Sequence, residues 1–218
     1  MLSIGKMRSG QEAYYASLAR EDYYLEGGEP PGQWFGQAAV AFGLTGTIDN
    51  QVFRDLFAGE FDGKPLVQNA GKENRCPGWD LTFSAPKSVS VAWSQAEAEI
   101  GMEIRAAHLQ AVEEALKYIE AECGWTRRGK EGFEREQAKM FFATFEHGTS
   151  RAQDPQLHTH AIVMNATIRQ DGKVRALASQ SSLQVEKEGK HGFMEHVYDR
   201  KMYFGNLYRA QLAYEITK

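Results

Sequence analysis

Three histidines give the strongest indication of chemistry in this sequence. His158 and His160 stand two residues apart in Leu-His-Thr-His, and ten residues separate His147 from His158. In a strand, residues two apart share one face, and a hairpin that pairs 138–147 with 157–165 brings His147 beside the other two. Three imidazoles on adjacent strands can hold a divalent metal and leave coordination positions for a substrate.

The alternative for this pattern is a pair of solvent-facing or packing histidines. A third histidine at hairpin distance, among apolar neighbours, favours the metal. These neighbours are Phe141, Phe142, Ala161 and Ile162. His108 differs, because it falls on the apolar stripe of a predicted helix, where we expect a packed side chain. His191 and His196 lack partner spacing and are interpreted as surface or packing residues.

A second motif covers residues 78–88, GWDLTFSAPKS. Asp80 is a carboxylate in an apolar strand, where an unpaired charge is costly, so we expect it to have a partner. The ring N–H of a metal-bound histidine is a typical one. A strand-edge or turn aspartate is the alternative. Lys87 follows the Ser-Ala-Pro turn, where it can contact a phosphate or simply be solvated.

A third feature is two tyrosine doublets near the N-terminus, at residues 14–15 and 23–24. Such doublets usually place one ring in the core and one outside. A phenol is a nucleophile only as phenolate, which is about one part in a thousand at neutral pH. Activation therefore needs a nearby cation or base, and the histidines provide a candidate cation site.

Apolar periodicity and turn residues predict the elements that position these groups. Alternation predicts strands at 1–7, 78–84, 138–147, 157–165 and, after the Asp-Gly turn at 171–172, at 173–179. Pro86 interrupts the second of these, and apolar character resumes over 88–93. Helices are predicted at 33–43, 49–58, 95–122 and from about 193 to 218, with Ser9 capping a short one through Tyr14 and Tyr15. The order predicts an α+β fold with an antiparallel sheet.

Composition limits the class of protein. With 218 residues and 42% hydrophobic residues the chain can build a core. Two cysteines exclude a disulfide scaffold and a cysteine-based zinc finger, and no membrane span or secretory segment is evident, so we expect a cytoplasmic protein. The net charge of −4 argues against a nucleic-acid partner, but residues after 70 outside 95–122 carry 18 Lys and Arg against 13 Asp and Glu.

Several side chains are candidates for contacts with a nucleic acid. Lys87 and Arg151 lie nearest the motifs and are the better phosphate candidates. A basic cluster that either follows a phosphate backbone or forms a solvated loop comprises Arg127, Arg128, Lys130 and Arg135. Aromatic residues that can stack bases, or simply pack in the core, are Trp34, Phe35 and Trp125.

Taken together, YY…DYY, DLTFSAPKSVS and FEHGTSRAQDPQLHTHAIVMN closely resemble the MobF-class conjugative relaxases (the TraI and TrwC type) of the HUH endonuclease superfamily. The resemblance implies that His147, His158 and His160 bind the metal and that Asp80 orients a ligand and accepts the nucleophile's proton. It implies Tyr14 as the main nucleophile and Tyr23 as the candidate for a second transfer.

The resemblance also implies a five-stranded, palm-like antiparallel sheet flanked by helices. We expect residues 1–218 to be one relaxase domain, truncated at its C-terminal end. Without a Walker motif, we expect no helicase activity. The implied substrate is single-stranded plasmid transfer-origin DNA, nicked through a 5′-phosphotyrosyl intermediate, with accessory relaxosome and coupling proteins as further partners. Mg²⁺ or Mn²⁺ is the implied ion, whereas the ligands alone suggest Zn²⁺.

Other functions stay open on the sequence alone. A rolling-circle replication initiator of the same superfamily would share the chemistry. A small-molecule metalloenzyme with three histidine ligands would need neither Tyr14 nor DNA. A non-catalytic single-strand binding module would keep the histidines as structural residues.

Overall fold

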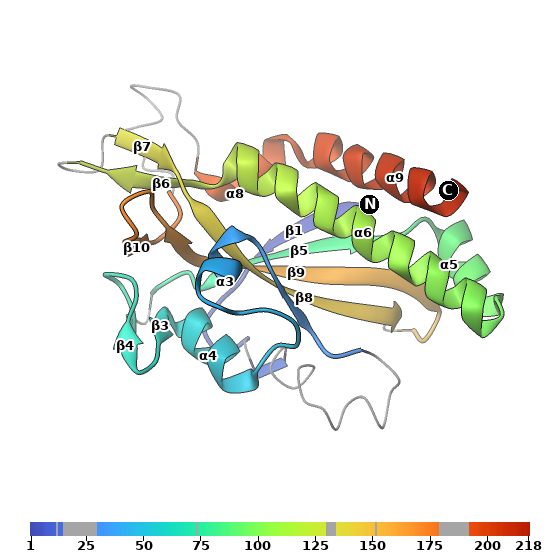
Figure 1. Cartoon of the computed structure of the whole chain (residues 1–218), viewed down its shortest axis with the longest axis horizontal. Coiled ribbons are helices and arrows are strands. Elements are labelled where there is room, and N and C mark those ends of the chain that lie inside the picture. Colours follow the sequence, from blue (N-terminus) through green and yellow to red (C-terminus); the bar gives the residue numbers. More distant parts are fainter. Residues whose placement is uncertain (12, 15–29, 73, 130–133, 151, 179–191) are drawn as a thin grey trace.

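The computed structural model describes residues 1–11, 13–14, 30–72, 74–129, 134–150, 152–178 and 192–218. An antiparallel sheet with helices on both faces forms the centre of the molecule (Figure 1). Its strands are β1 (Leu2–Lys6), β2 (Gln33–Phe35), β5 (Gly78–Ser84), β8 (Lys139–Thr149), β9 (Pro155–Ile168) and β10 (Val174–Arg175). The helices are α3 (Gln37–Ala41), α4 (Asn50–Ala58), α5 (Lys87–Gln95), α6 (Ala98–Cys123), α8 (Phe193–Asp199) and α9 (Lys201–Thr217). Two small hairpins lie outside the sheet, β3 (Glu60–Phe61) with β4 (Lys64–Pro65) and β6 (Trp125–Arg128) with β7 (Glu134–Gln137).

The sheet has six strands, one more than expected. Its order is β1-β5-β9-β8-β2, and β10 pairs with the end of β9. The α+β class and four of the predicted strands are confirmed, but the helix predicted over 33–43 was wrong in its first half. Gly36 has φ 99°, and a Cβ there would lie 2.4 Å from the Met140 carbonyl oxygen. The chain therefore pairs with β8 before Gly36 and becomes helical only after it.

Two other boundaries differ from the prediction. Residues 88–93, whose apolar character resumes after Pro86, belong to helix α5, because proline has no N–H to continue the ladder of β5. The long C-terminal helix is two helices that meet at Arg200. The strand predicted over 173–179 retains only Val174–Arg175.

Helices α6 and α9 cover one face of the sheet, and α3 and α4 pack on the other. On the first face Leu81, Phe83 and Val163 pack in the same core as the middle of α6. The predicted α6 stripe is buried from Ala107 to Ile119, but Ile100 is exposed because it lies near the beginning of the helix. Gly124 ends the helix, as predicted.

On the second face Phe145, Ile162 and Met164 pack in one core with α3 and α4. Even-numbered residues of β9 share this face, so His158 and His160 lie on the same side as Ile162 and Met164. The second face therefore carries the histidines at one end and an apolar core at the other.

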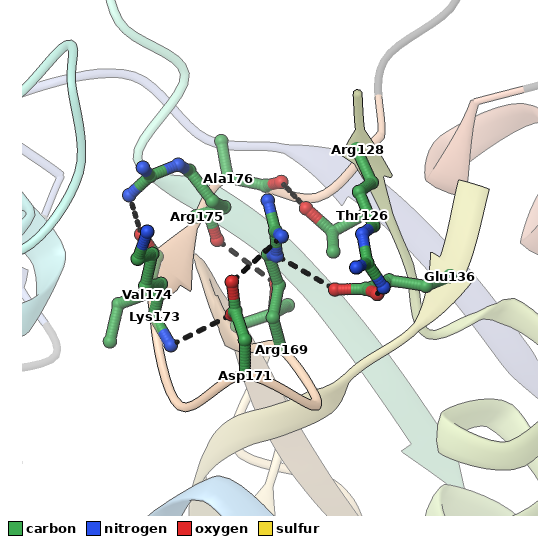
Figure 2. A network of polar contacts seen from close by, with 10 residues as sticks. Thr126, Arg128, Glu136, Arg169, Asp171, Lys173, Val174, Arg175 and Ala176 are labelled. Atoms are coloured by element: carbon green, nitrogen blue, oxygen red, sulfur yellow. Dashed lines mark hydrogen bonds and ion pairs between the residues drawn. The ribbon is translucent and has the colours of Figure 1, made fainter. Parts of the chain in front are cut away.

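Polar contacts attach the β6–β7 hairpin to the sheet (Figure 2). Glu136 forms ion pairs with Arg169 at 2.7 Å and with Arg128 at 3.2 Å. The Thr126 hydroxyl donates to the Ala176 carbonyl oxygen over 2.8 Å. The hairpin is thereby held beside the turn between β9 and β10. Among the described residues no helix is long and apolar enough to cross a membrane.

His108 is a fully buried histidine that links three elements, which confirms its expected packing role. Its Nδ1 lies 2.7 Å from the Tyr208 hydroxyl of α9, and its Nε2 lies 2.8 Å from Thr159 Oγ1 of β9. Burial and then nearby positive charges lower the pKa of His108 to about 3. The ring is therefore neutral and uses one nitrogen as donor and the other as acceptor.

We expect acid to destabilise the fold through His108. The unfolded chain binds a proton there near pH 6.5, whereas the folded chain binds it only near pH 3. The contribution of His108 to the free energy of unfolding is therefore fully present above pH 6.5. It decreases toward pH 3, by up to about 1.4 kcal/mol per pH unit. Between pH 4 and 7, the free energy of unfolding measured by urea denaturation should depend more steeply on pH in the wild type than in His108→Gln. Parallel profiles would contradict a neutral His108.

Candidate metal-binding and catalytic site

Strand pairing brings the three histidines together. His147 of β8 lies directly opposite His158 of β9, and Phe145 lies opposite His160. The three pairs of ring centroids are each 5.2 Å apart, so the rings form an equilateral triangle. The hairpin predicted from the spacing of these histidines is therefore present.

Oxygen acceptors determine the tautomers of two of the rings. His158 Nδ1 donates to the carbonyl oxygen of Gln156 over 2.8 Å. His160 Nδ1 donates to Asp80 Oδ2 over 2.8 Å. A neutral imidazole that donates from Nδ1 carries its lone pair on Nε2. In its neutral form, each of these rings would therefore present the lone pair of Nε2 to a metal ion.

Asp80 reaches the site from the neighbouring strand β5. Its backbone pairs with Ile162, which places its side chain two positions along β9 from His160. Thr82, two residues further along β5, donates from Oγ1 to Asp80 Oδ1 over 3.3 Å and also lies 3.3 Å from His160 Nδ1. The sequence analysis did not identify Thr82. Its i+2 spacing from Asp80 in a predicted strand was the signal that could have found it.

The spacing of the rings fits a metal ion. A tetrahedral ion about 2.1 Å from three imidazole nitrogens holds the ring centroids roughly 5.3 Å apart, close to the 5.2 Å observed. Within the described ranges no group of three or more His, Cys, Asp or Glu side chains meets the geometry of a metal site as it stands. The spacing that the pairing of β8 with β9 produces is therefore the observation that favours a shared ion.

Burial favours the neutral form of these histidines. It lowers the pKa of His147 to about 4, with smaller contributions from the charges of His160 and His158. Burial likewise lowers the pKa of His158. Neutral imidazole is the form that binds metals, so both side chains are available as ligands at neutral pH.

Contacts on the opposite face hold the two histidine-bearing strands against α6. Thr159, between two of the histidines, is fully buried and bonded to His108. Glu146, which precedes His147, is buried and forms an ion pair with Arg105 of α6. These residues were not identified from the sequence, because their partners come from distant segments of the chain.

Of the two predicted nucleophiles, Tyr14 lies within the described residues and Tyr23 does not. Tyr14 follows β1 in a short helical segment, and its side chain is 56% exposed. Ser9 and Ala13 of the same segment line a hollow of about 680 Å³ together with Arg54 and Lys72. Tyr15, Tyr23 and Tyr24 lie outside the described residues, as do the phosphate candidate Arg151 and His191.

Lys87 lies at the end of the sheet that carries the histidines. Its Nζ donates to the carbonyl oxygen of Pro155 over 3.0 Å, and the side chain is otherwise exposed. Three of the four predicted basic-cluster residues lie on the β6–β7 hairpin, where Arg128 pairs with Glu136. Lys130 lies outside the described residues. The structure thus attaches the hairpin near the end of β9 at Arg169, whereas Lys87 lies at the beginning of β9, near His158.

Comparison with known proteins identifies the family. A family model described as TrwC relaxase matches residues 8–218. The chain belongs to the TrwC relaxase family. The multifunctional conjugation protein TraI of Escherichia coli (strain K12) is 40% identical to it over 224 residues, which include 99% of this chain and 12% of TraI. The chain thus spans about an eighth of the length of this curated relative.

Solved relaxase structures share the fold. The conjugative relaxase TrwC in complex with oriT DNA is 33% identical and superposes with a TM-score of 0.78, covering all of this chain and 69% of that one. A metal-bound TrwC–oriT DNA structure is 32% identical with a TM-score of 0.79, and a copper-bound one is 34% identical with a TM-score of 0.78. Both cover all of this chain and 70% of the TrwC chain. The family interpretation made from the motifs is confirmed.

We expect Asp80→Asn to weaken divalent-metal binding without unfolding the protein. The carboxylate accepts the His160 Nδ1 proton, and loss of such an outer partner lowers metal affinity about 10- to 100-fold. Titration calorimetry with Mn²⁺ or Co²⁺ measures this change. Asp199→Asn, at an exposed carboxylate of α8, serves as the matched control. Equal affinities in the two variants would contradict the role of Asp80.

Proposed function

We propose that this chain is the nicking domain of a conjugative relaxase, which cleaves one strand of DNA at a transfer origin by transesterification. The observation that carries the proposal is the triangle of His147, His158 and His160 with Asp80 bonded to the third ring. Membership of the TrwC relaxase family supports it. TrwC itself has been solved with oriT DNA.

The three histidines would hold a divalent cation through ring nitrogens. Such an ion supplies positive charge to the nonbridging oxygens of the scissile phosphate, worth several kcal/mol in the transition state. We propose Mg²⁺ or Mn²⁺ as the working ion from the family resemblance. Imidazole ligands by themselves favour zinc and similar metals. Binding of Zn²⁺ without turnover is therefore an expected competing behaviour.

Tyr14 is the proposed nucleophile. Its phenolate oxygen forms a bond to phosphorus, the bond from phosphorus to the 3′ oxygen breaks, and the departing 3′ oxygen takes up a proton from solvent to become a 3′-hydroxyl. Asp80 is the proposed acceptor of the phenol proton, because it is the carboxylate that contacts the trio. The 5′-phosphate stays on the tyrosine as a diester, which retains the energy needed to rejoin a strand.

The energy retained in the phosphotyrosyl ester is the reason to favour transfer of a DNA strand over degradation of the DNA. A later 3′-hydroxyl can attack the phosphotyrosyl ester and reverse the reaction without a nucleotide cofactor. A second tyrosine allows a second transfer before the first ester is resolved, and we propose Tyr23 for this role. Water as the nucleophile would lose the bond energy at the first step.

The proposed substrate is a single DNA strand, as the resemblance to the relaxase family implies. Lys87 and Arg151 are the proposed phosphate contacts near the site. We further propose that the protein acts in the cytoplasm with accessory relaxosome and coupling proteins. TrwC has also been solved in complex with a 27-mer DNA that comprises the recognition hairpin and the cleavage site.

We expect Tyr14→Phe to abolish the covalent protein–DNA adduct. Single-stranded fragments of the DNA that surrounds the gene are incubated with protein and Mg²⁺ or Mn²⁺, and adducts are separated on a denaturing gel. Sequencing the DNA held in the wild-type adduct maps the cleaved phosphate. The hydroxyl of Tyr14 is the bond-forming group, so its removal should reduce adduct to background while metal binding is unchanged.

Tyr214→Phe, at an exposed tyrosine of α9, is the matched control and should retain full adduct yield. Chelation of the metal with EDTA should stop adduct formation and renewed Mn²⁺ should restore it. An adduct that persists in Tyr14→Phe but is lost in Tyr23→Phe would reassign the nucleophile. A wild type that never forms an adduct would favour a small-molecule metalloenzyme or a binding module.

A further inference from the structure

A hollow of about 440 Å³ lies at the end of the sheet that carries the histidines. Its walls come from the end of α5, the first turns of α6 and the ends of β8 and β9, which meet at one end of the molecule in Figure 1. The volume falls within the range of about 300–1,000 Å³ occupied by small-molecule sites. Nothing in the proposed cleavage reaction so far uses it.

An aromatic ring forms one wall of the hollow. Trp93 is half-buried and packs on the core of the first face. A Cβ at Gly148 would lie 2.6 Å from the edge of this ring, so the indole packs directly on the backbone that follows His147. Trp93 also lines the hollow. A half-exposed indole in a concave site is suited to stacking of a planar ligand.

A polar side chain reaches the hollow from a strained position. Gln153 has φ 64°, a left-handed conformation that is uncommon for a residue with a side chain. Ser150 builds this turn, since its carbonyl oxygen accepts from the Gln153 amide over 2.9 Å. The Gln153 side chain is exposed and lines the hollow. An amide that both donates and accepts can bond to the edge of a nucleobase.

The charged groups near the hollow are of both signs. Arg105 lines it and is already paired with Glu146. Glu97 also lines it, and Lys87 lies beside it at the Pro155 carbonyl. The site therefore favours a neutral planar group inside and a phosphate near Lys87. A nucleotide has this distribution of charge.

Residues that line the hollow are close in sequence to the histidines. Gly148 directly follows His147, and Pro155 lies three residues before His158. The histidines lie on the second face of the sheet and the hollow lies toward α5 and α6. A DNA strand that passes around the ends of β8 and β9 would join the hollow to the trio.

We propose that this hollow is a base-binding subsite, in which a nucleobase close to the cleaved phosphate stacks on Trp93 and is bonded at its edge by Gln153. The inference rests on the proposed nicking function and adds to it a determinant of sequence preference. The subsite takes one unpaired base, and it is occupied only when the strand is single.

An abasic scan tests the subsite. The oligonucleotide mapped in the adduct assay is made with one abasic position at a time, over five nucleotides on each side of the cleaved phosphate. Binding is measured by fluorescence anisotropy in a Tyr14→Phe background. At one position the abasic change should weaken binding roughly 5- to 150-fold. In Trp93→Ala the intact oligonucleotide should bind equally weakly, and the same abasic change should have no further effect.

Two further variants separate stacking from a loss of folding. Trp93→Phe keeps a ring on Gly148 and should retain most of the affinity. Gln153→Ala changes an exposed side chain and should leave thermal stability intact. It should reduce the differences in binding affinity among oligonucleotides that carry each of the four bases at the same position. Tyr198→Ala removes an exposed ring of α8 outside the hollow and should change neither measurement.

The outcomes distinguish this inference from the proposed function. The subsite is overturned if the wild type forms an adduct and, at every position, the abasic change lowers binding affinity equally in the wild type and in Trp93→Ala. The nicking function would then still stand. Unchanged base preference in Gln153→Ala overturns the role of its amide. Absence of any adduct in the wild type overturns the proposed function and the subsite with it.

Discussion

The antiparallel pairing of β8 with β9 is the contact on which the candidate site depends. Because His147 lies opposite His158, a single register of this pair puts three imidazoles on one face. A shift of the register by one residue would turn His158 and His160 to the opposite face. Buried residues on both sides of β9 oppose such a shift, since Leu157 and Ala161 pack on one core and Ile162 and Met164 on the other.

Polar contacts on the helix-covered face reinforce this register. Thr159 lies between two of the histidines and points to the opposite side, where it meets His108 and, through it, Tyr208. Glu146 makes the equivalent contact for β8 with Arg105. Breaking a buried polar contact of this kind leaves a partner unsatisfied, which typically costs about 1–3 kcal/mol. Contacts on the helix-covered face thus help to position the candidate metal ligands on the other face.

Many of the positively charged side chains also have a structural role. The net charge of −4 conceals a local arrangement in which cations of the β6–β7 hairpin and the β9–β10 turn are paired within the protein. Glu136 is held between two arginines, so these cations fix the hairpin in place as well as contributing positive charge. Net charge alone is therefore a poor guide to the proposed substrate, and the motifs are a better one.

Sequence spacing by itself predicted that the three histidines come together, because a period of two and a ten-residue connection leave few ways to fold such a hairpin. Apolar alternation predicted the strand that carries Asp80, and the resemblance of the longer motifs indicated the family. Apolar periodicity also placed His108 correctly in the core. The first half of the helix predicted over 33–43 and the continuous helix to Lys218 were wrong, since close packing of Gly36 on Met140 and a break at Arg200 are not local properties. Only the tertiary structure decided that Arg105 meets Glu146 and that Trp93 packs on Gly148. Each of these contacts joins segments or side chains whose proximity depends on how the whole sheet is assembled, and no local pattern records it.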